Sequence, residues 1–228
     1  MQPLSESICI RPATSADIPF LANNIHEACL QPLNHCFFDD LVDGLGVDGI
    51  GFLEGLLRAG ASAWGGVEDS HILEEGGVPV ASAFGYVPDP EDCRPFRLSR
   101  FPQLATELGW TPEQTEEFRA RYETMASIDE CANVFQPQAE FILEYVAVVP
   151  EARGRGLIKI LLQAILAQAK TRGFASAGIM IINGNDSAAH VYTSLGFKPY
   201  CAYYEDFFAD SVPGFPGFTR YRLRFGKH

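Results

Sequence analysis

The sequence has 228 residues, of which 47% are hydrophobic, so the chain can bury a sizeable core and intrinsic disorder is not expected. Its 29 acidic and 17 basic side chains give a formal net charge of −12, which argues against a general nucleic-acid binder. Residues 1–87 hold 12 acids and two bases, and residues 88–137 hold ten acids and five bases. Residues 138–228 instead hold seven acids and ten bases, so we expect two ligand-facing surfaces of opposite charge.

The sequence lacks the patterns typical of membrane spans, signal peptides and metal sites, and these absences give predictions for the compartment and the metal content. A membrane span needs about 18 consecutive apolar residues, and since no such stretch occurs we expect no membrane partner. Residues 1–7 have neither a basic flank nor an apolar run, so we expect no signal peptide. The six cysteines form no Cys-x-x-Cys pair, which is typical of free thiols in a reducing compartment and predicts a cytoplasmic location. Because the five histidines are equally scattered, we expect no metal site.

The first 87 residues predict strands and helices from the spacing of their apolar positions. In chain order we expect a strand at 8–12, a helix at 18–30, a loop or broken helix at 31–49, a helix at 52–58 that ends at Gly60, and strands at 71–75 and 78–87. The last two strands flank Gly76-Gly77, which predicts a tight hairpin.

Residues 88–137 differ in character from the segments on either side. Four prolines between positions 88 and 102 interrupt regular structure. Thr111-Pro112-Glu113 then provides a helix cap with proline at the first helical position, and the helix is predicted to run to about residue 128. We interpret this stretch as a mostly helical insertion.

The last third of the chain again alternates between strands and helices. In order we expect a strand at 139–149, a helix from about 157 to 172 ended by Gly173, a strand at 175–182 buried on both faces, a helix at 185–194, a strand-like segment at 197–208 and a half-exposed strand at 218–225.

The sharpest local signal is the turn Arg153-Gly-Arg-Gly156 between the predicted strand at 139–149 and the helix after it. Glycines let a backbone approach an anion closely, and a helix N-terminus presents free N–H groups to a phosphate. The turn is not a Walker A loop, because no Gly-Lys-Ser/Thr follows, and it lacks the third glycine of a dinucleotide fingerprint. The alternative is an ordinary turn with surface arginines.

A family resemblance rests on two motifs in this region. The run 143–156 resembles the acetyl-CoA motif of the GNAT superfamily of N-acetyltransferases, whose loop Gln/Arg-x-x-Gly-x-Gly/Ala is matched by Arg153, Gly156 and, imperfectly, Ile158. About thirty residues later, a second run resembles that family's motif Asn-x-x-Ala-x-x-x-Tyr-x-x-x-Gly-Phe. Its matching residues are Asn185, Ala188, Tyr192, Gly196 and Phe197.

The resemblance implies an α/β (α+β) fold in which a GNAT-like mixed, mostly antiparallel central sheet is splayed at the 139–149 strand and flanked by helices. The chain would then be a single GNAT-like domain, 1–228, with its insertion at about 88–137. Acetyl-CoA would lie in the splay as co-substrate. By resemblance, the residues that would bind it are Val146, Ala147 and Val148 along the pantetheine arm, Arg153, Gly154, Arg155, Gly156, Leu157 and Ile158 around the pyrophosphate, and Asn185.

Two side chains are the candidates for catalysis. Tyr192 occupies the family's general-acid position, and a phenol with a pKa of about 10 is protonated at pH 7 and can donate to the CoA sulfur. Glu144 could accept the amine proton, and it would share a strand face with Val146 if no bulge intervenes. Glu140 is a weaker alternative, and the amide of Val148 or a neighbour would serve as oxyanion donor. Both candidates also have purely structural alternatives, a packed tyrosine and a carboxylate in a hydrogen-bond network.

The resulting prediction is an N-acetyltransferase that moves an acetyl group directly from acetyl-CoA to a primary amine. The acidic first half favours a cationic small-molecule or peptide acceptor. Two alternatives stay open, a non-catalytic CoA-binding or sensor module and a transferase of a longer acyl group. The acceptor's identity and the oligomeric state, for which a homodimer is one option, are not given by the sequence.

Overall fold

The computed structural model describes residues 7–89, 95–126, 139–208 and 214–226. Seven strands in these ranges form one sheet in the order β1-β2-β3-β4-β5-β7-β6. All neighbouring strands are antiparallel except β4 and β5, so the mixed, mostly antiparallel sheet is confirmed. The strands are β1 (Ile8–Pro12), β2 (Ser70–Glu75), β3 (Val78–Tyr86), β4 (Phe141–Val148), β5 (Ser176–Ile182), β6 (Lys198–Tyr204) and β7 (Gly217–Arg224).

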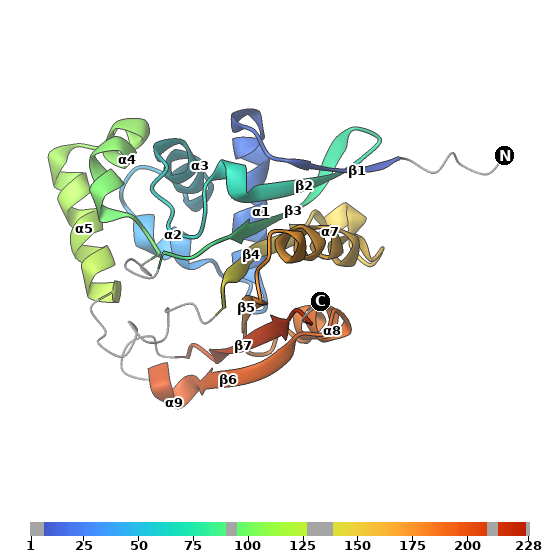
Figure 1. Ribbon diagram of the computed structural model, residues 1–228. Helices are drawn as coiled ribbons and strands as arrows, with labels where there is room; N and C mark the ends of the chain where they lie inside the picture. Colours follow the sequence, from blue (N-terminus) through green and yellow to red (C-terminus); the bar gives the residue numbers. More distant parts are fainter. Residues whose placement is uncertain (1–6, 90–94, 127–138, 209–213, 227–228) are drawn as a thin grey trace.

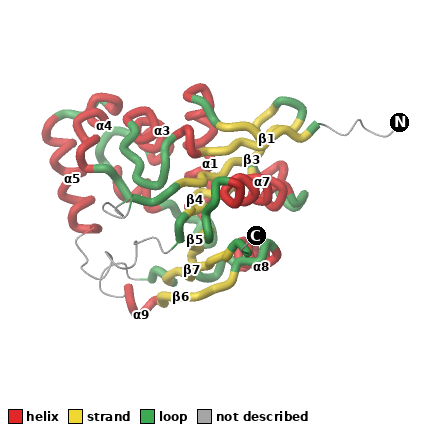
Figure 2. The backbone as a smooth tube through the Cα atoms, viewed as in Figure 1, coloured by secondary structure: helices red, strands yellow, loops and turns green. Residues whose placement is uncertain are grey.

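The helices lie on both faces of this sheet (Figure 1). They are α1 (Ile18–Leu30), α2 (Phe37–Val42), α3 (Gly49–Ala59), α4 (Phe101–Leu108), α5 (Pro112–Ala126), α7 (Leu157–Thr171), α8 (Asp186–Ser194) and α9 (Glu205–Phe208). Figure 2 shows α3, α4 and α5 gathered at one end of the molecule, away from α7 and α8. None of the helices in the described ranges combines the length and apolar character needed to cross a bilayer.

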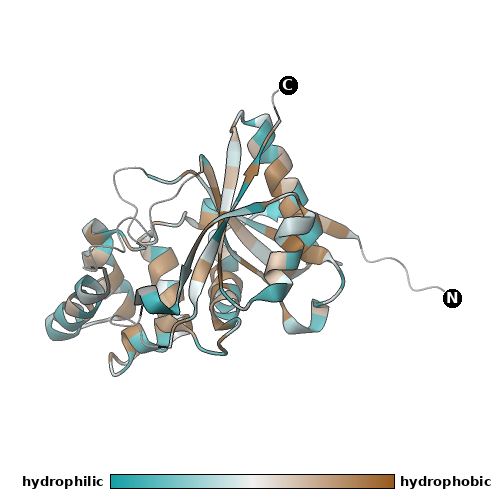
Figure 3. Cartoon of the chain, turned by 90° about the horizontal axis from the view of Figure 1, so that it is seen from below, coloured by the Kyte–Doolittle hydropathy of each residue, from teal (hydrophilic) through white to brown (hydrophobic). Residues whose placement is uncertain are grey.

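Two buried clusters fill the space between sheet and helices. One joins α1 and α3 to Ile72, Phe84 and Ile142 of the sheet, and the other joins α7 and α8 to alternate residues such as Leu73 and Leu143. Because successive side chains in a strand point to opposite faces, the two clusters lie on opposite sides of the sheet. Figure 3 shows hydrophobic residues along the central strands and hydrophilic ones on outer helix turns.

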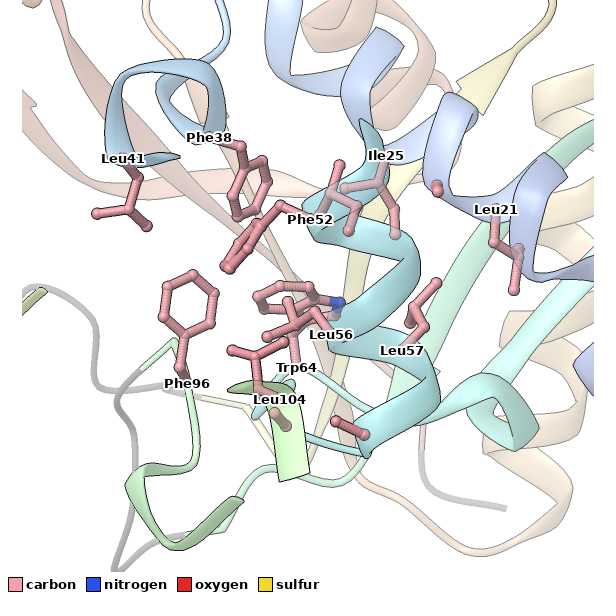
Figure 4. Packing of buried hydrophobic residues seen from close by; sticks show 14 of the residues in the cluster. Leu21, Ile25, Phe38, Leu41, Phe52, Leu56, Leu57, Trp64, Phe96 and Leu104 are labelled. Atoms are coloured by element: carbon pink, nitrogen blue, oxygen red, sulfur yellow. The ribbon is translucent and has the colours of Figure 1, made fainter. Parts of the chain in front are cut away.

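The insertion contributes to the first of these clusters. Its described residues Phe96, Phe101, Leu104, Phe118 and Tyr122 are all buried there. Figure 4 shows Phe96 and Leu104 beside side chains from the α1, α2 and α3 region. α4 packs closely on α3 at Gly55, where a Cβ would lie 2.5 Å from Leu108 Cδ2. The described part of the insertion therefore belongs to the same core as the N-terminal helices.

The sheet divides between β4 and β5. The two strands pair only at Phe141↔Ala177 and Ile142↔Gly178, and they separate beyond that point. β5 then pairs along its whole length with β7 instead. The backbone edge of β4 beyond Ile142 consequently faces an opening, which is the splay expected at this strand.

Most predicted elements are observed, and the differences have local causes. The segment 31–49 contains α2, and α3 begins three residues early because Asp48 caps it by accepting from Gly51 N at 2.7 Å. The strand-like segment 197–208 ends at Tyr204, after which two acids favour the first turn of α9. The expectation that β5 is buried on both faces is wrong for Met180, which is 38% exposed.

Candidate active site

A β-bulge in β4 shapes the centre of the site. Ser82 pairs with Ala147 and Phe84 pairs with Glu144, so Tyr145 and Val146 together oppose one residue of β3. Tyr145 has a φ of 46°, which is rare for a residue with a side chain. The bulge changes the expected orientation: Tyr145 packs on the α1 side of the sheet, whereas Val146 packs on the α7 side. Glu144 and Val146 therefore do not share a face as they would in a regular strand.

Glu144 is held beside a tyrosine from the neighbouring strand. The Tyr86 hydroxyl donates to Glu144 Oε2 at 3.2 Å, across a diagonal pair of β3 and β4. Burial raises the pKa of Glu144 to about 7, and the hydrogen bond from Tyr86 opposes part of that rise. A carboxylate with a pKa near neutrality can exchange a proton readily at physiological pH.

Tyr192 lies on α8, on the other side of the splay. Its ring is only 5% exposed and makes an edge contact with Phe197 at 6.2 Å between ring centroids. Burial raises the pKa of Tyr192 above its usual range, and the negative charge of Glu144 raises it further. The hydroxyl therefore stays protonated at neutral pH. The effect of Glu144 on Tyr192 also means that the two candidate catalytic groups are electrostatic neighbours across the opening.

The turn before α7 has the properties of an anion cradle. Gly154 and Gly156 adopt φ values of 75° and 76°, where a side chain would be strained. Within the described ranges no acceptor is assigned to five successive amides, those of residues 154–158. These N–H groups lie at the N-terminus of a 15-residue helix, where the helix dipole adds positive potential.

Both arginines of this turn are paired with carboxylates that sequence reasoning missed. Arg155 makes two bonds of 2.6 Å to Glu75, whose side chain is 7% exposed, at the end of β2. Arg153 makes a 2.6 Å bond to Glu27 of α1, and the side chains of Arg153 and Glu27 are 45% and 31% exposed. Partners so distant in sequence leave no local pattern, so no signal in the chain could have identified them.

The remaining predicted cofactor residues are placed around the same opening. Val146, Ala147 and Val148 form the end of β4 beyond the split. Ile158 is half-buried and packs on the α7-side cluster, so its branched side chain points into the core rather than into the turn. Asn185 caps α8, with Oδ1 accepting from Ala188 N at 3.1 Å.

Glu140, the weaker alternative for the base, does not lie beside Glu144 and Tyr192 at the opening. It is exposed at the start of β4, and its Oε2 accepts from Ala175 N at 2.6 Å, which ties β4 to β5 at the closed end of the splay.

Comparison with known proteins identifies the family. Residues 63–197, more than half of the chain, match the sequence model of the acetyltransferase (GNAT) family. The chain belongs to the GNAT family. Family membership makes this protein an acyl-CoA-dependent acetyltransferase. No curated protein gives a significant sequence match.

Solved structures share the GNAT fold at low sequence identity. The chain is 17% identical to yncA from Salmonella typhimurium, solved with its cofactor acetyl-CoA, with 97% of this chain and 96% of that chain covered and a TM-score of 0.53. A ribosomal-protein-alanine N-acetyltransferase from Brucella melitensis is 18% identical, with 95% and 99% covered and a TM-score of 0.53. An agmatine N-acetyltransferase in its apo form is 13% identical, with 96% and 99% covered and a TM-score of 0.52.

Proposed function

We propose that this GNAT protein transfers an acetyl group from acetyl-CoA directly to a primary amine, with Glu144 as base and Tyr192 as acid. The observation that carries the proposal is the pairing of a carboxyl group of pKa about 7 with a protonated tyrosine across the β4–β5 opening. A single domain, a cytoplasmic location and a homodimer remain predictions from the sequence.

The residues around the opening fit acetyl-CoA. In the part of the chain that the structure describes, the amides of residues 154–158 have no protein acceptor, and they and the glycines of the 153–156 turn suit a pyrophosphate. The edge of β4 that does not pair with β5 there suits the peptide-like pantetheine arm. When bound, acetyl-CoA supplies the activated acetyl group. Oδ1 of Asn185 accepts the capping hydrogen bond, and the amide nitrogen of that side chain can donate to a ligand.

Each step of the proposed transfer needs one group of the chain. Glu144 accepts a proton from the ammonium form of the acceptor, directly or through water, so that the nitrogen lone pair can attack the acetyl carbonyl. An amide at Val148 or a neighbour donates to the developing oxyanion. Tyr192 donates its proton to the sulfur as the carbon–sulfur bond breaks, and the second proton lost by the acylated nitrogen returns to the Tyr192 oxygen, directly or through water. The products are a thiol and a neutral N-acetyl amide.

A cationic acceptor is the substrate class favoured by charge. A hollow of about 470 Å³ lies where α2 connects to α3 and is lined by Asp39, Asp43 and Asp48 among its residues. Acidic walls raise the local concentration of a cation. The named substrates of two proteins with this fold, agmatine and a protein alanine, are also amines. Turnover confined to anionic or neutral amines in an acceptor panel would contradict this part of the proposal.

Tyr192→Phe tests the transfer mechanism. We expect a fall of about 100-fold in kcat with unchanged acetyl-CoA binding by calorimetry, because the ring remains and only the proton donor is lost. Glu140→Gln is the matched control, and it should retain wild-type turnover. A chain that binds acetyl-CoA but transfers to no amine would support the alternative of a non-catalytic CoA-binding or sensor module. A preference for longer acyl-CoA thioesters would support the alternative of a transferase for a longer acyl group.

A further inference from the structure

We propose that His26, Cys29, Cys36 and Asp39 form a binding site for a zinc-like divalent cation, separate from the acetyl-transfer groups. A ligand atom from each of His26, Cys36 and Asp39 lies within 4.8 Å of those of the other two. The thiols of Cys29 and Cys36 are hydrogen-bonded to one another, so a fourth donor lies beside this group of three, in contact with Cys36. Apart from Asp39, which also lines the acidic hollow described above, no function assigned above uses these side chains.

Two helices and the turn between them bring the four residues together. His26 and Cys29 are three residues apart on α1, so they lie on one face of that helix. Cys36 is the N-cap residue of α2, and Asp39 follows in its first turn. The Nε2 atom of His26 lies 3.0 Å from Asp39 Oδ2, and small side-chain adjustments would let the donors of His26, Cys36 and Asp39 converge on one ion. Cys29 would join them through its contact with Cys36.

The donor types select the class of ion. One imidazole nitrogen, two sulfurs and one carboxylate oxygen suit a tetrahedral, borderline-soft cation such as Zn²⁺. Calcium and magnesium prefer oxygen ligands alone, so this set does not suit them. Because all four positions are filled by protein groups, the site would be structural rather than catalytic.

Burial and space at the cluster also fit an ion. Cys36 is fully buried and Cys29 nearly so, whereas the side chains of His26 and Asp39 are 17% and 45% exposed. An ion could therefore enter past Asp39, which also lines the acidic hollow described above. Gly49 leaves room for this carboxylate, because a Cβ there would lie 2.1 Å from Asp39 Oδ1.

This proposal departs from the expectation of no metal site. The spacing His-x2-Cys-x6-Cys-x2-Asp has no familiar Cys-x-x-Cys element, and only the turn between α1 and α2 makes it a cluster. Cys29 lies near enough to Glu144 for their charges to interact, so the ion would fix α1 and α2 beside the proposed transfer site.

The test uses the full chain, stripped by a chelator under reducing conditions and titrated with Zn²⁺ alone or Co²⁺ alone. We expect one ion per chain and thiolate-to-cobalt charge-transfer absorption. Cys36→Ser and His26→Ala should each weaken binding by about tenfold or more. Zn²⁺ should raise the Tm of the wild type and not that of these variants.

Two substitutions outside the proposed site serve as controls. His35→Ala removes an exposed ion pair with Asp40 from the same segment, and Cys9→Ser removes an exposed thiol, so both should bind Zn²⁺ like the wild type. The proposal would be overturned by binding of less than one ion per chain or by absence of the thiolate-to-cobalt band. It would also be overturned if His35→Ala lost as much Zn²⁺ affinity as His26→Ala and Cys36→Ser. If Cys36→Ser does not fold, the cobalt spectrum of the wild type and the His26→Ala titration decide. Because binding is measured without acetyl-CoA or an amine, the result is independent of the proposed transferase function.

Discussion

The Tyr86 hydroxyl donates to Glu144 across two antiparallel strands, next to the bulge that turns Tyr145 toward the same side. Burial of this carboxyl group raises the pKa of Glu144 to about 7, and the hydrogen bond from Tyr86 offsets part of that rise. The proposed base is thus half charged near neutral pH.

The first prediction concerns pH and rate. With Glu144 as base, kcat/KM should rise with pH, by close to tenfold per unit well below pH 7, and level off above about 7. Tyr86→Phe removes the donor that favours the charged form, so the inflection should move to higher pH. The measurement is a kcat/KM profile from pH 5 to 9 in both proteins, and an inflection that does not move would argue against Glu144.

The second prediction concerns pH and stability. The folded pKa of Glu144 lies above its unfolded value of 4.5, so the folded state binds more protons between pH 4.5 and 7, and this carboxyl lowers stability as pH rises through that window. Glu144→Gln cannot ionise and should therefore be more stable than the wild type at pH 8, by at most on the order of 3 kcal/mol.

Urea unfolding at several pH values checks this stability difference. It should shrink as pH falls from about 7 to 4.5 and vanish at lower pH, where the carboxyl is protonated in both states. Glu107→Gln, at an exposed carboxylate of α4, is the control and should match the wild type. A Glu144→Gln protein that is less stable than the wild type at pH 8 would contradict the prediction.

The third prediction concerns the exposed pair between Arg153 and Glu27. If Arg153 exchanges this partner for a phosphate, Arg153→Gln should raise the KM for acetyl-CoA about tenfold, with a smaller change in kcat. Glu27→Gln should lower that KM about threefold, because the competing carboxylate is gone. The double variant should resemble Arg153→Gln alone. If Glu27→Gln changed the KM for acetyl-CoA equally in the wild type and in the Arg153→Gln background, Glu27 would not compete with a phosphate for Arg153.

The fourth prediction concerns Asp17, which joins β1 to the start of α1. Arg11 donates to both of its oxygens at 2.7 and 2.8 Å, and Thr14 donates from its backbone and its hydroxyl. Arg11 holds the pKa of Asp17 well below its usual range. Since the side chain is largely buried, Asp17→Asn should cost about 3 kcal/mol at pH 7.

The sign of the acid dependence follows from that lowered pKa. The stability contributed by Asp17 is present above its unfolded pKa of 3.8 and is lost as pH falls below it. Wild type and Asp17→Asn should therefore converge in stability at low pH in urea titrations. Glu151→Gln, at an exposed carboxylate, is the control and should match the wild type throughout.

Local patterns in the sequence were sufficient for most elements. Periodic apolar residues and caps predicted α1, α7 and the β2–β3 hairpin, and the paired motifs predicted the family, which the comparison confirms. The bulge at Tyr145 was not predictable, because an aromatic residue gives no sign that it will adopt a positive φ. The carboxylate partners of Arg153 and Arg155 and the His26 cluster depend on tertiary contacts. The segment 127–138, where the insertion's helix was expected to end, lies outside the described residues.

The short ladder between β4 and β5 has a mechanical consequence. Among the described residues, only two residue pairs of β4 and β5 join the two halves of the sheet, so the β5–β7–β6 half is attached along a narrow line. Side-chain packing under α7 and α8, rather than main-chain hydrogen bonding, must then resist bending at this line. The stiffness of the connection between the two halves therefore depends on packing in the α7-side core. Small changes in that packing would alter how readily the halves move apart when a ligand enters or leaves.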